Sequence, residues 1–224
     1  NGGKSLLTGR QIGLTDEELG LTGTLKDKLS NIREAFYKHV DYFMDRRTKH
    51  ANGASVAVSH LPVPFLSCFM GGIESGIDTR DVKRQGTKYN GSGCLVHGLS
   101  VVADSFIAID TMLRERPDEC GRLLEDLRNN FEGDEEFRQY LLSCKKFGNN
   151  DDIVDNEAVE IADKVSDMLR SKKNYLGNPF RPDFSTPSTH LIYGSLVGAL
   201  PSGRKAKEML NYGVDPLYGE AQYG

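Results

Sequence analysis

The strongest constraint on the fold is a run of apolar residues at helical spacing between residues 30 and 49. Apolar side chains recur there every three or four positions, and charged or polar side chains fill the positions between them. The apolar stripe consists of Ile32, Phe36, Val40 and Phe43. Such a stripe predicts a long amphipathic helix, which we expect to end near Lys49, before the Asn52-Gly53 turn signal.

The same spacing predicts further helices along the chain. Their expected ranges are 64–76, 103–116, 119–131 and 135–144, and another follows Asp152 or Asp155, either of which can cap it. The spacing is lost in residues 174–188, which we expect to form a loop, whereas the short apolar segment 189–200 predicts a buried strand. Many helices with few candidate strands predict an α-rich α/β fold, such as a barrel or sheet covered by helices.

Composition and charge limit the functional classes. The 224 residues are 38% hydrophobic and 27% charged, which suits one ordinary domain or a large piece of a bigger one. The net charge of −4 is spread along the chain and argues against nucleic acid or a membrane as partner. No apolar run reaches the ~20 residues of a membrane span and no signal peptide is visible, so we expect a cytoplasmic protein. Because the chain opens at Asn1 in a Gly-rich loop, we expect a fragment or processed piece.

Residues that could hold a metal or a redox centre are scattered. The four cysteines lie far apart, with no C-x-x-C pair and no His at ligand spacing: they are Cys68, Cys94, Cys120 and Cys144. This spacing argues against a zinc site and predicts reduced thiols. The acidic run Asp151, Asp152 and Asp155 lacks the distal Glu of an EF-hand, so helix capping is the preferred interpretation. We expect no metal and no bound cofactor.

Residues 86–110 combine a polar, Gly-rich half with an apolar half, a common way to present chemistry on a rigid element. Cys94 and His97 lie three residues apart and could act as a nucleophile and its base. The alternative is an inert, buried cysteine, since pairs so close in sequence seldom reach a productive geometry. Near the end of the chain, the segment 201–205 predicts an exposed turn, with an anion contact as the alternative.

Five stretches of the chain, taken in order, resemble one enzyme family. They are NGGKSLLTGRQIG, KYNGSG followed by GLSVVADSFIAID, NNFEGDEEFRQYLL, KKFGNNDDIVD, and YGSLVGALPSGRKAKEMLNYGVDPLYG. Together they are similar to the glycyl radical enzymes, the superfamily of pyruvate formate-lyase, the dehydratases and the decarboxylases. The resemblance implies a portion of a ten-stranded α/β barrel wrapped by many helices. It also implies radical cleavage of a C–C, C–O or C–N bond in a small polar substrate.

Members of this family carry two catalytic loops. One holds the cysteine that becomes a thiyl radical, often within G-C-V-E, and the other holds the radical glycine within R-V-x-G-Y. Neither sequence occurs here, and Cys94 lies in a segment that follows the cysteine loop in the family, so it is not given the thiyl role. The resemblance therefore implies an internal section, residues 1–224 as one segment of the barrel domain, inactive alone and without a catalytic residue of its own.

The resemblance also implies partners. The radical would be installed on a glycine outside this chain by an activating enzyme that uses S-adenosylmethionine and an iron–sulfur cluster, and the full-length protein would be a homodimer. We expect five residues nearest the substrate: Lys88, Tyr89, Asn90, Cys94 and His97. Alternatively, Tyr89 and Asn90 only fix the loop.

The substrate stays open, because KYN is not followed by the F-T-G-P-Q usual in dehydratases. Formate acetyltransferase-like, dehydratase-like and decarboxylase-like activities are all compatible with the resemblance. Two alternatives remain. One is a non-catalytic relic or structural subunit with the same architecture, and the other is an acyl-transfer enzyme that uses Cys94 and His97.

Overall fold

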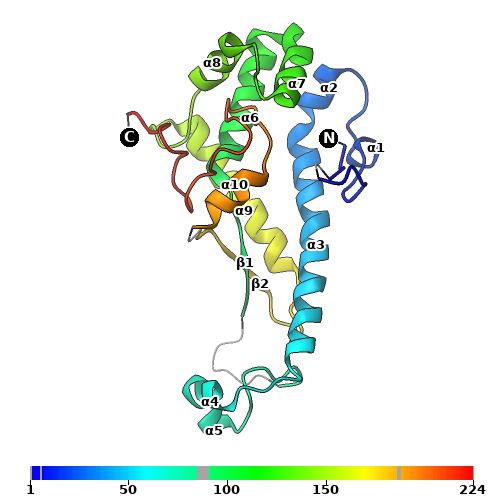
Figure 1. Cartoon of the computed structure of the whole chain (residues 1–224), viewed down its shortest axis with the longest axis vertical. Coiled ribbons are helices and arrows are strands. Elements are labelled where there is room, and N and C mark those ends of the chain that lie inside the picture. The colour runs from blue at the N-terminus through cyan, green and yellow to red at the C-terminus, as the bar shows by residue number, and fades with distance from the viewer. Residues whose placement is uncertain (1, 6, 85–90, 186–187, 224) are drawn as a thin grey trace. The chain divides into compact units, whose positions relative to one another are not determined.

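The computed structural model describes residues 2–5, 7–84, 91–185 and 188–223 (Figure 1). This part of the chain is rich in helices and carries a small sheet, as expected for an α-rich fold. Its contacts divide the chain into two compact units. The first comprises Asn1–Lys38, Leu95–Lys164 and Phe184–Gly224, and the second comprises His39–Cys94 and Val165–Asp183. None of the helices within the described ranges has the length and apolar character needed to cross a membrane.

The first unit contains most of the helices. They are α1 (Asp16–Leu19), α2 (Leu25–Ser30), α6 (Leu99–Glu115), the 3₁₀ turn η2 (Pro117–Glu119), α7 (Cys120–Asn129), α8 (Glu135–Ser143) and α10 (Thr189–Leu196). The unit also holds the start of α3 (Ile32–Val58) and most of α9 (Asp152–Ser171). Thr15 and Thr24 begin α1 and α2 with capping boxes, in which the carboxylate of an acidic residue three positions later accepts a hydrogen bond from the backbone amide of the cap.

Helix α6 forms the centre of this unit because it is apolar on almost every side. Met112 of α6 is fully buried against Leu123 of α7 and Phe137 and Leu141 of α8. Arg33 of α3 adds a polar tie at the edge of this core. Its guanidinium donates to Asp110 of α6 at 2.7 Å and to Glu157 of α9 at 2.9 Å. Helices α7 and α8 confirm, within a few residues, the amphipathic helices predicted over 119–131 and 135–144.

The second unit holds the rest of α3, the end of α9 and a run of short helical segments, which are α4 (Pro64–Ser67), the π-helical turn η1 (Cys68–Gly72) and α5 (Ile73–Ser75). The helix predicted over 64–76 is confirmed but kinked, because Gly71 adopts a φ of 93°. Strands β1 (Ser92–Leu95) and β2 (Phe180–Asp183) pair into a two-stranded sheet. Strand β2 lies inside the segment predicted as a loop, so that prediction was wrong there.

The predicted end of the long helix was wrong. Helix α3 continues through Asn52-Gly53 to Val58, and Gly53 does not take the positive φ that an Asn-Gly turn needs. The Asn52 side chain instead donates a hydrogen bond to the carbonyl of Lys173 at 3.0 Å. A tertiary contact therefore uses the residue whose local preference is for a turn.

The strand predicted over residues 189–200 was also wrong, since α10 occupies most of that segment. Gly194 explains why a helix fits here. A Cβ on Gly194 would lie 2.4 Å from the carbonyl oxygen of Glu208, so glycine allows the helix to press against a neighbouring loop. The apolar side chains of α10 are not buried either, because Leu191, Ile192 and Leu196 are exposed in this part of the protein.

Two smaller differences concern helix starts. Helix α6 begins at Leu99, ahead of the predicted Ala103. At the start of α9, the Asp151 carboxylate accepts the hydrogen bond of the Ile153 amide at 3.0 Å. The acidic run therefore caps a helix as predicted, but Asp151 is the capping residue in place of Asp152 or Asp155.

Candidate functional site

The five residues predicted to lie nearest the substrate are only partly covered by the structure. Lys88, Tyr89 and Asn90 fall outside the described residues. Cys94 lies on β1 in the second unit, half-buried. His97 belongs to the first unit, just before α6, where its ring lies 4.7 Å from the ring of Tyr193.

The environment of Cys94 is unlike that of a catalytic thiol. Burial raises the pKa of Cys94, and the positive charge of Arg47 offsets this only in part. A nucleophilic cysteine needs the opposite, a pKa lowered by nearby positive charge or a helix N-terminus. This geometry favours the buried-cysteine interpretation over an acyl-transfer site.

Alkylation should distinguish the two interpretations of Cys94. We expect iodoacetamide near neutral pH to label the exposed Cys68 well before Cys94, because Cys94 is less accessible and its raised pKa leaves little thiolate. Peptide mass spectrometry over a time course measures both rates in one sample. Labelling of Cys94 ahead of Cys68 would indicate an activated thiol and revive the acyl-transfer hypothesis.

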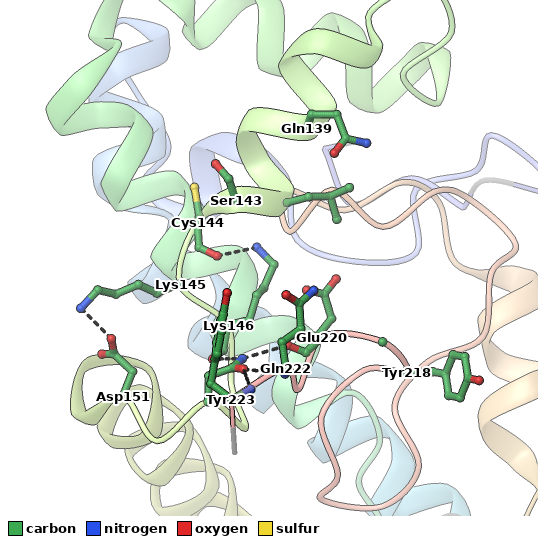
Figure 2. Close-up of a pocket in the computed structure, with 13 residues that line it drawn as sticks. Gln139, Ser143, Cys144, Lys145, Lys146, Asp151, Tyr218, Glu220, Gln222 and Tyr223 are labelled. Carbon is green, nitrogen blue, oxygen red and sulfur yellow. Dashed lines mark hydrogen bonds and ion pairs between the residues drawn. The ribbon is translucent and has the colours of Figure 1, made fainter.

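A polar pocket lies elsewhere in the first unit, between the end of α8, the loop that leads to α9, and the C-terminal segment (Figure 2). Its volume is about 740 Å³. The lining side chains are mostly polar or charged, and they come from residues 139–151 and 218–223. No pattern in the sequence predicts that these two segments meet.

Lys146 forms the inner wall of this pocket. Its ammonium group donates to the carbonyls of Leu141 at 2.7 Å and Cys144 at 3.1 Å, which are acceptors at the C-terminal end of α8. Only 5% of Lys146 is exposed, and burial lowers its pKa, although the charges of Glu220 and Asp104 act in the opposite direction. Lys146 is thus a buried cation placed at the negative end of a helix dipole.

Glu220 supplies the opposing negative charge. Burial raises the pKa of the Glu220 carboxyl group, and the charge of Lys146 counteracts this effect. Figure 2 shows both side chains at the centre of the pocket. Both residues are described, yet no ion pair joins them, so each keeps an incompletely compensated charge.

Asn149 fixes the segment that carries Glu220. Its Nδ2 donates to the carbonyl of Glu220 at 2.9 Å, and its Oδ1 accepts hydrogen bonds from the amides of Gln222 at 2.7 Å and Tyr223 at 3.1 Å. Next to it, Gly148 lies so close to Pro216 that a Cβ at this position would clash. The pocket wall is therefore built by tertiary hydrogen bonds and close packing.

Asp104 of α6 lies behind the pocket and is only 1% exposed. One carboxylate oxygen accepts the hydrogen bond of the Phe147 amide at 2.7 Å. Burial is the main cause that raises the pKa of Asp104 to about 7, and the amide of Phe147 and the charge of Lys146 moderate the effect. Asp104 is therefore an acid that titrates near neutrality beneath the Lys146 loop.

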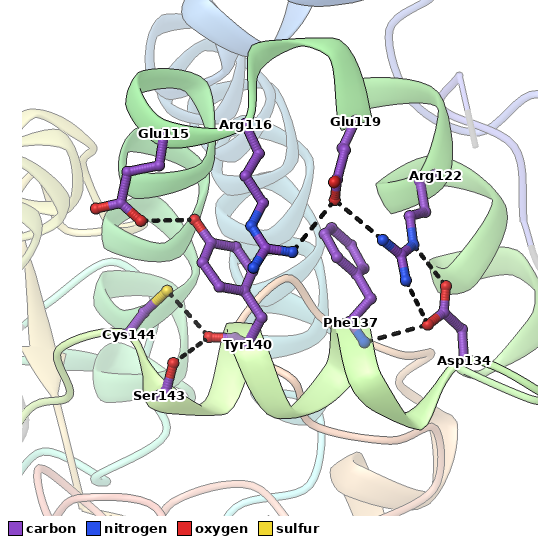
Figure 3. A network of polar contacts seen from close by, with 9 residues as sticks. All are labelled: Glu115, Arg116, Glu119, Arg122, Asp134, Phe137, Tyr140, Ser143 and Cys144. Carbon is purple, nitrogen blue, oxygen red and sulfur yellow. Dashed lines mark hydrogen bonds and ion pairs between the residues drawn. The ribbon is translucent and has the colours of Figure 1, made fainter.

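A surface network fixes α8, the helix whose carbonyls hold Lys146 (Figure 3). The Arg122 guanidinium donates to both carboxylate oxygens of Asp134, at 2.6 and 2.7 Å, and holds the pKa of Asp134 at about 2. Arg116 stacks on Tyr140 with 3.9 Å between guanidinium carbon and ring centre, and the Tyr140 hydroxyl donates to Glu115. These contacts join α7 and the C-terminal end of α6 to α8.

Within the described ranges, no group of three or more His, Cys, Asp or Glu side chains is arranged to hold a metal ion. In place of a set of metal ligands, the polar pocket presents a positively charged nitrogen and negatively charged carboxylate oxygens. Its chemistry is that of hydrogen bonding and charge recognition.

Comparison with known proteins identifies the family. A sequence model of the pyruvate formate lyase-like proteins matches residues 1–194. The chain belongs to this family. Its stretches that resemble the glycyl radical enzymes were therefore interpreted correctly, and that prediction is confirmed.

Several family members are similar along almost all of this chain. The trans-4-hydroxy-L-proline dehydratase of Clostridioides difficile is 28% identical over 98% of this chain and 27% of its own length. The glycerol-bound B12-independent glycerol dehydratase of Clostridium butyricum superposes with a TM-score of 0.87 and 29% identity, over 100% of this chain and 28% of that one. A glycyl radical enzyme of Archaeoglobus fulgidus gives a TM-score of 0.83 and 30% identity, over 99% and 28%. The chain thus spans little more than a quarter of these relatives.

Sequence reasoning missed the charged residues of the pocket. The stretch KKFGNNDDIVD contributed to the family resemblance, but no role was predicted for Lys146 or Asn149 within it. Glu220 lies 71 residues beyond Asn149 in the chain, so no local pattern could pair them. Gly148, two residues after Lys146, takes a φ of 87°, and the glycine is only a weak signal in the sequence that this loop turns tightly.

Proposed function

We propose that this chain is a section of a glycyl radical dehydratase, which removes water from a small hydroxylated substrate. Similarity to two dehydratases along the chain carries the proposal. The backbone superposes along its entire length on a glycerol dehydratase with a TM-score of 0.87, and the sequence matches a hydroxyproline dehydratase over 98% of the chain. C–O cleavage is therefore favoured over the acyl-transfer and decarboxylation activities of other glycyl radical enzymes.

In this proposal the 224 residues supply one segment of a ten-stranded α/β barrel and its outer helices. Exposed apolar side chains support the presence of covering elements from the rest of the protein. In the second unit, Phe65, Phe69 and Ile73 are 80%, 74% and 78% exposed, which is unusual for a finished surface. Both the radical glycine and the thiyl cysteine lie outside this chain.

The reaction is a net elimination. A partner enzyme using S-adenosylmethionine and an iron–sulfur cluster would remove hydrogen from the glycine, and a thiyl radical would then take hydrogen from the substrate carbon. The C–O bond breaks, water leaves, and hydrogen returns from the thiol, so there is no net oxidation. The task of this chain is to orient the substrate and exclude water. We assign Lys88, Tyr89, Asn90, Cys94 and His97 to the wall of that substrate site.

Anaerobic activation tests the proposal. The full-length protein that carries this chain is incubated with its activating enzyme and S-adenosylmethionine, and the glycyl radical is measured by electron paramagnetic resonance. Glycerol and trans-4-hydroxy-L-proline are then supplied separately, and products are measured by mass spectrometry. We expect a glycyl radical signal and, for one of these substrates or a near analogue, a product that has lost one water. A His97→Gln variant should raise KM for that substrate.

Three other outcomes would contradict the proposal in different ways. A radical that forms formate and acetyl-coenzyme A from pyruvate would indicate a formate acetyltransferase. A radical that releases carbon dioxide from an arylacetate would indicate a decarboxylase. Absence of any radical, in a preparation where the activating enzyme works on a known partner, would favour the non-catalytic relic.

A further inference from the structure

We propose that the pocket between Lys146 and Glu220 binds a small zwitterion, an α-amino acid, with its carboxylate against Lys146 and its ammonium group against Glu220. The lining of this pocket shares no residue with the substrate wall proposed above. The pocket lies wholly within the first unit, so its geometry does not depend on the second.

Lys146 is prepared to receive an anion. A lysine ammonium group has three N–H donors, and two of them are used by the carbonyls of Leu141 and Cys144. The two carbonyls hold the group in place at the pocket wall, and Figure 2 shows the bond to the Cys144 carbonyl. One donor remains for a ligand carboxylate.

Glu220 is prepared to receive a cation. Among the described residues, none donates a hydrogen bond to its carboxylate, although its backbone carbonyl is held by Asn149. The segment that bears Glu220 is also tied at Gln222 and Tyr223 by the Asn149 side chain, which limits its freedom. A ligand that binds a prearranged site loses less free energy to ordering the protein.

The remaining charges of the pocket are already matched. Lys145 and Asp151 form an ion pair of 2.7 Å with each other. Lys146 and Glu220 act on each other only through their charges, since no ion pair joins them, and Asp104 and Arg138 add weaker opposite charges. A ligand with a single charge would contact one of the two groups, and a neutral polyol would match the charge of neither. A zwitterion satisfies both.

Hydrogen exchange measured by mass spectrometry locates binding in a protein of any size. The unactivated full-length protein is titrated separately with each neutral L-amino acid, and with lactate, ethanolamine and glycerol. We expect one or more amino acids to slow exchange in peptides that cover residues 145–151 and 217–223. Lactate lacks the ammonium group, ethanolamine lacks the carboxylate and glycerol lacks both, so each should bind at least about tenfold more weakly.

Two variants test the assigned contacts. Glu220→Gln keeps the shape of the side chain and should weaken amino-acid binding about tenfold or more while leaving the weak binding of lactate unchanged. Glu132→Gln removes an exposed carboxylate outside the pocket and should have no effect. Because Glu220 accepts no side-chain hydrogen bond from the described residues, its substitution should not unfold the protein.

Several results would overturn the proposal. No change in either peptide with any amino acid would show that the pocket does not bind this class. Protection only elsewhere in the protein would place amino-acid binding at a different site. Equal binding of lactate, or full binding by the Glu220→Gln variant, would show that the pocket recognises an anion alone. None of these measurements requires a radical, so they are independent of the proposed dehydratase activity.

Discussion

Replacement of Arg204 by Met should lower the local free energy of opening by about 3–5 kcal/mol, the largest effect we expect from one substitution in this chain. Arg204 is 1% exposed. Its guanidinium donates hydrogen bonds to the carbonyls of Gly194 and Gly198 at 2.9 Å each, and also to those of Glu208 and Met209. Methionine fills a similar volume but would leave these buried acceptors without donors.

Native-state hydrogen exchange gives the measurement. The amides of Gly203, Lys207 and Leu210 donate to backbone carbonyls in the loop that Arg204 organises, so their protection reports its opening. Arg204→Lys should lower the same free energy of opening by more than half of the loss expected for the Met variant. A lysine ammonium group lacks the planar fork of donors with which the guanidinium reaches several carbonyls at once.

The neighbouring residue provides a matched control. Lys205 forms an ion pair of 3.5 Å with Glu135, and both side chains are exposed. Lys205→Met should therefore change stability by less than about 1 kcal/mol. Equal effects of the two Met substitutions would contradict the view that the buried guanidinium organises this loop.

Replacement of Asp104 by Asn should stabilise the protein at pH 8 by about 2–4 kcal/mol and have almost no effect at pH 4. The pKa of Asp104 rises from its usual 3.8 to about 7 in the folded state. The folded protein thus holds this proton more tightly than the unfolded chain does. Its contribution to stability is fully present below about pH 4 and is lost as the pH rises toward 7.

Asparagine is neutral at every pH and keeps an oxygen that can accept the hydrogen bond of the Phe147 amide. It also removes a negative charge near Lys146, which is why the gain should fall below the full value expected from the pKa alone. Urea unfolding at pH 4, 6 and 8 measures the difference between variant and parent. The exposed Asp163 is the control, since Asp163→Asn should show no such trend.

The opposite sign at pH 8 would be informative. If Asp104→Asn destabilised the protein there, the ionised carboxylate would be stabilising the fold through Lys146. The pKa of Asp104 would then not be raised in the folded protein.

Helices with a clear apolar stripe were predictable from local pattern. Helix α8 lies within one residue of the predicted range 135–144, because Phe137 and Leu141 are one turn apart and face the same core. The pattern is sufficient there because each helix satisfies its own backbone hydrogen bonds, and only one face has to be buried.

Segments shaped by distant contacts were not predictable in this way. Asn52-Gly53 is a strong local turn signal, but a contact with Lys173 keeps α3 helical through it. Residues 201–205 were interpreted as an exposed turn or an anion contact. Arg204 is instead buried and bound to backbone carbonyls, which follows from the loop closing around it.

The amino-acid sequence by itself determined the family and the α-rich character, because collinear stretches and apolar periodicity are properties of the chain read in order. Only the tertiary structure decided which charges are buried. Lys146 and Asp104 are buried and Glu220 is half-buried; the three come from separate segments of the chain, where each alone would be an ordinary surface residue. Their pKa values, and the pocket that Lys146 and Glu220 line, depend on desolvation and on charges brought close by packing, and these exist only once the segments have come together.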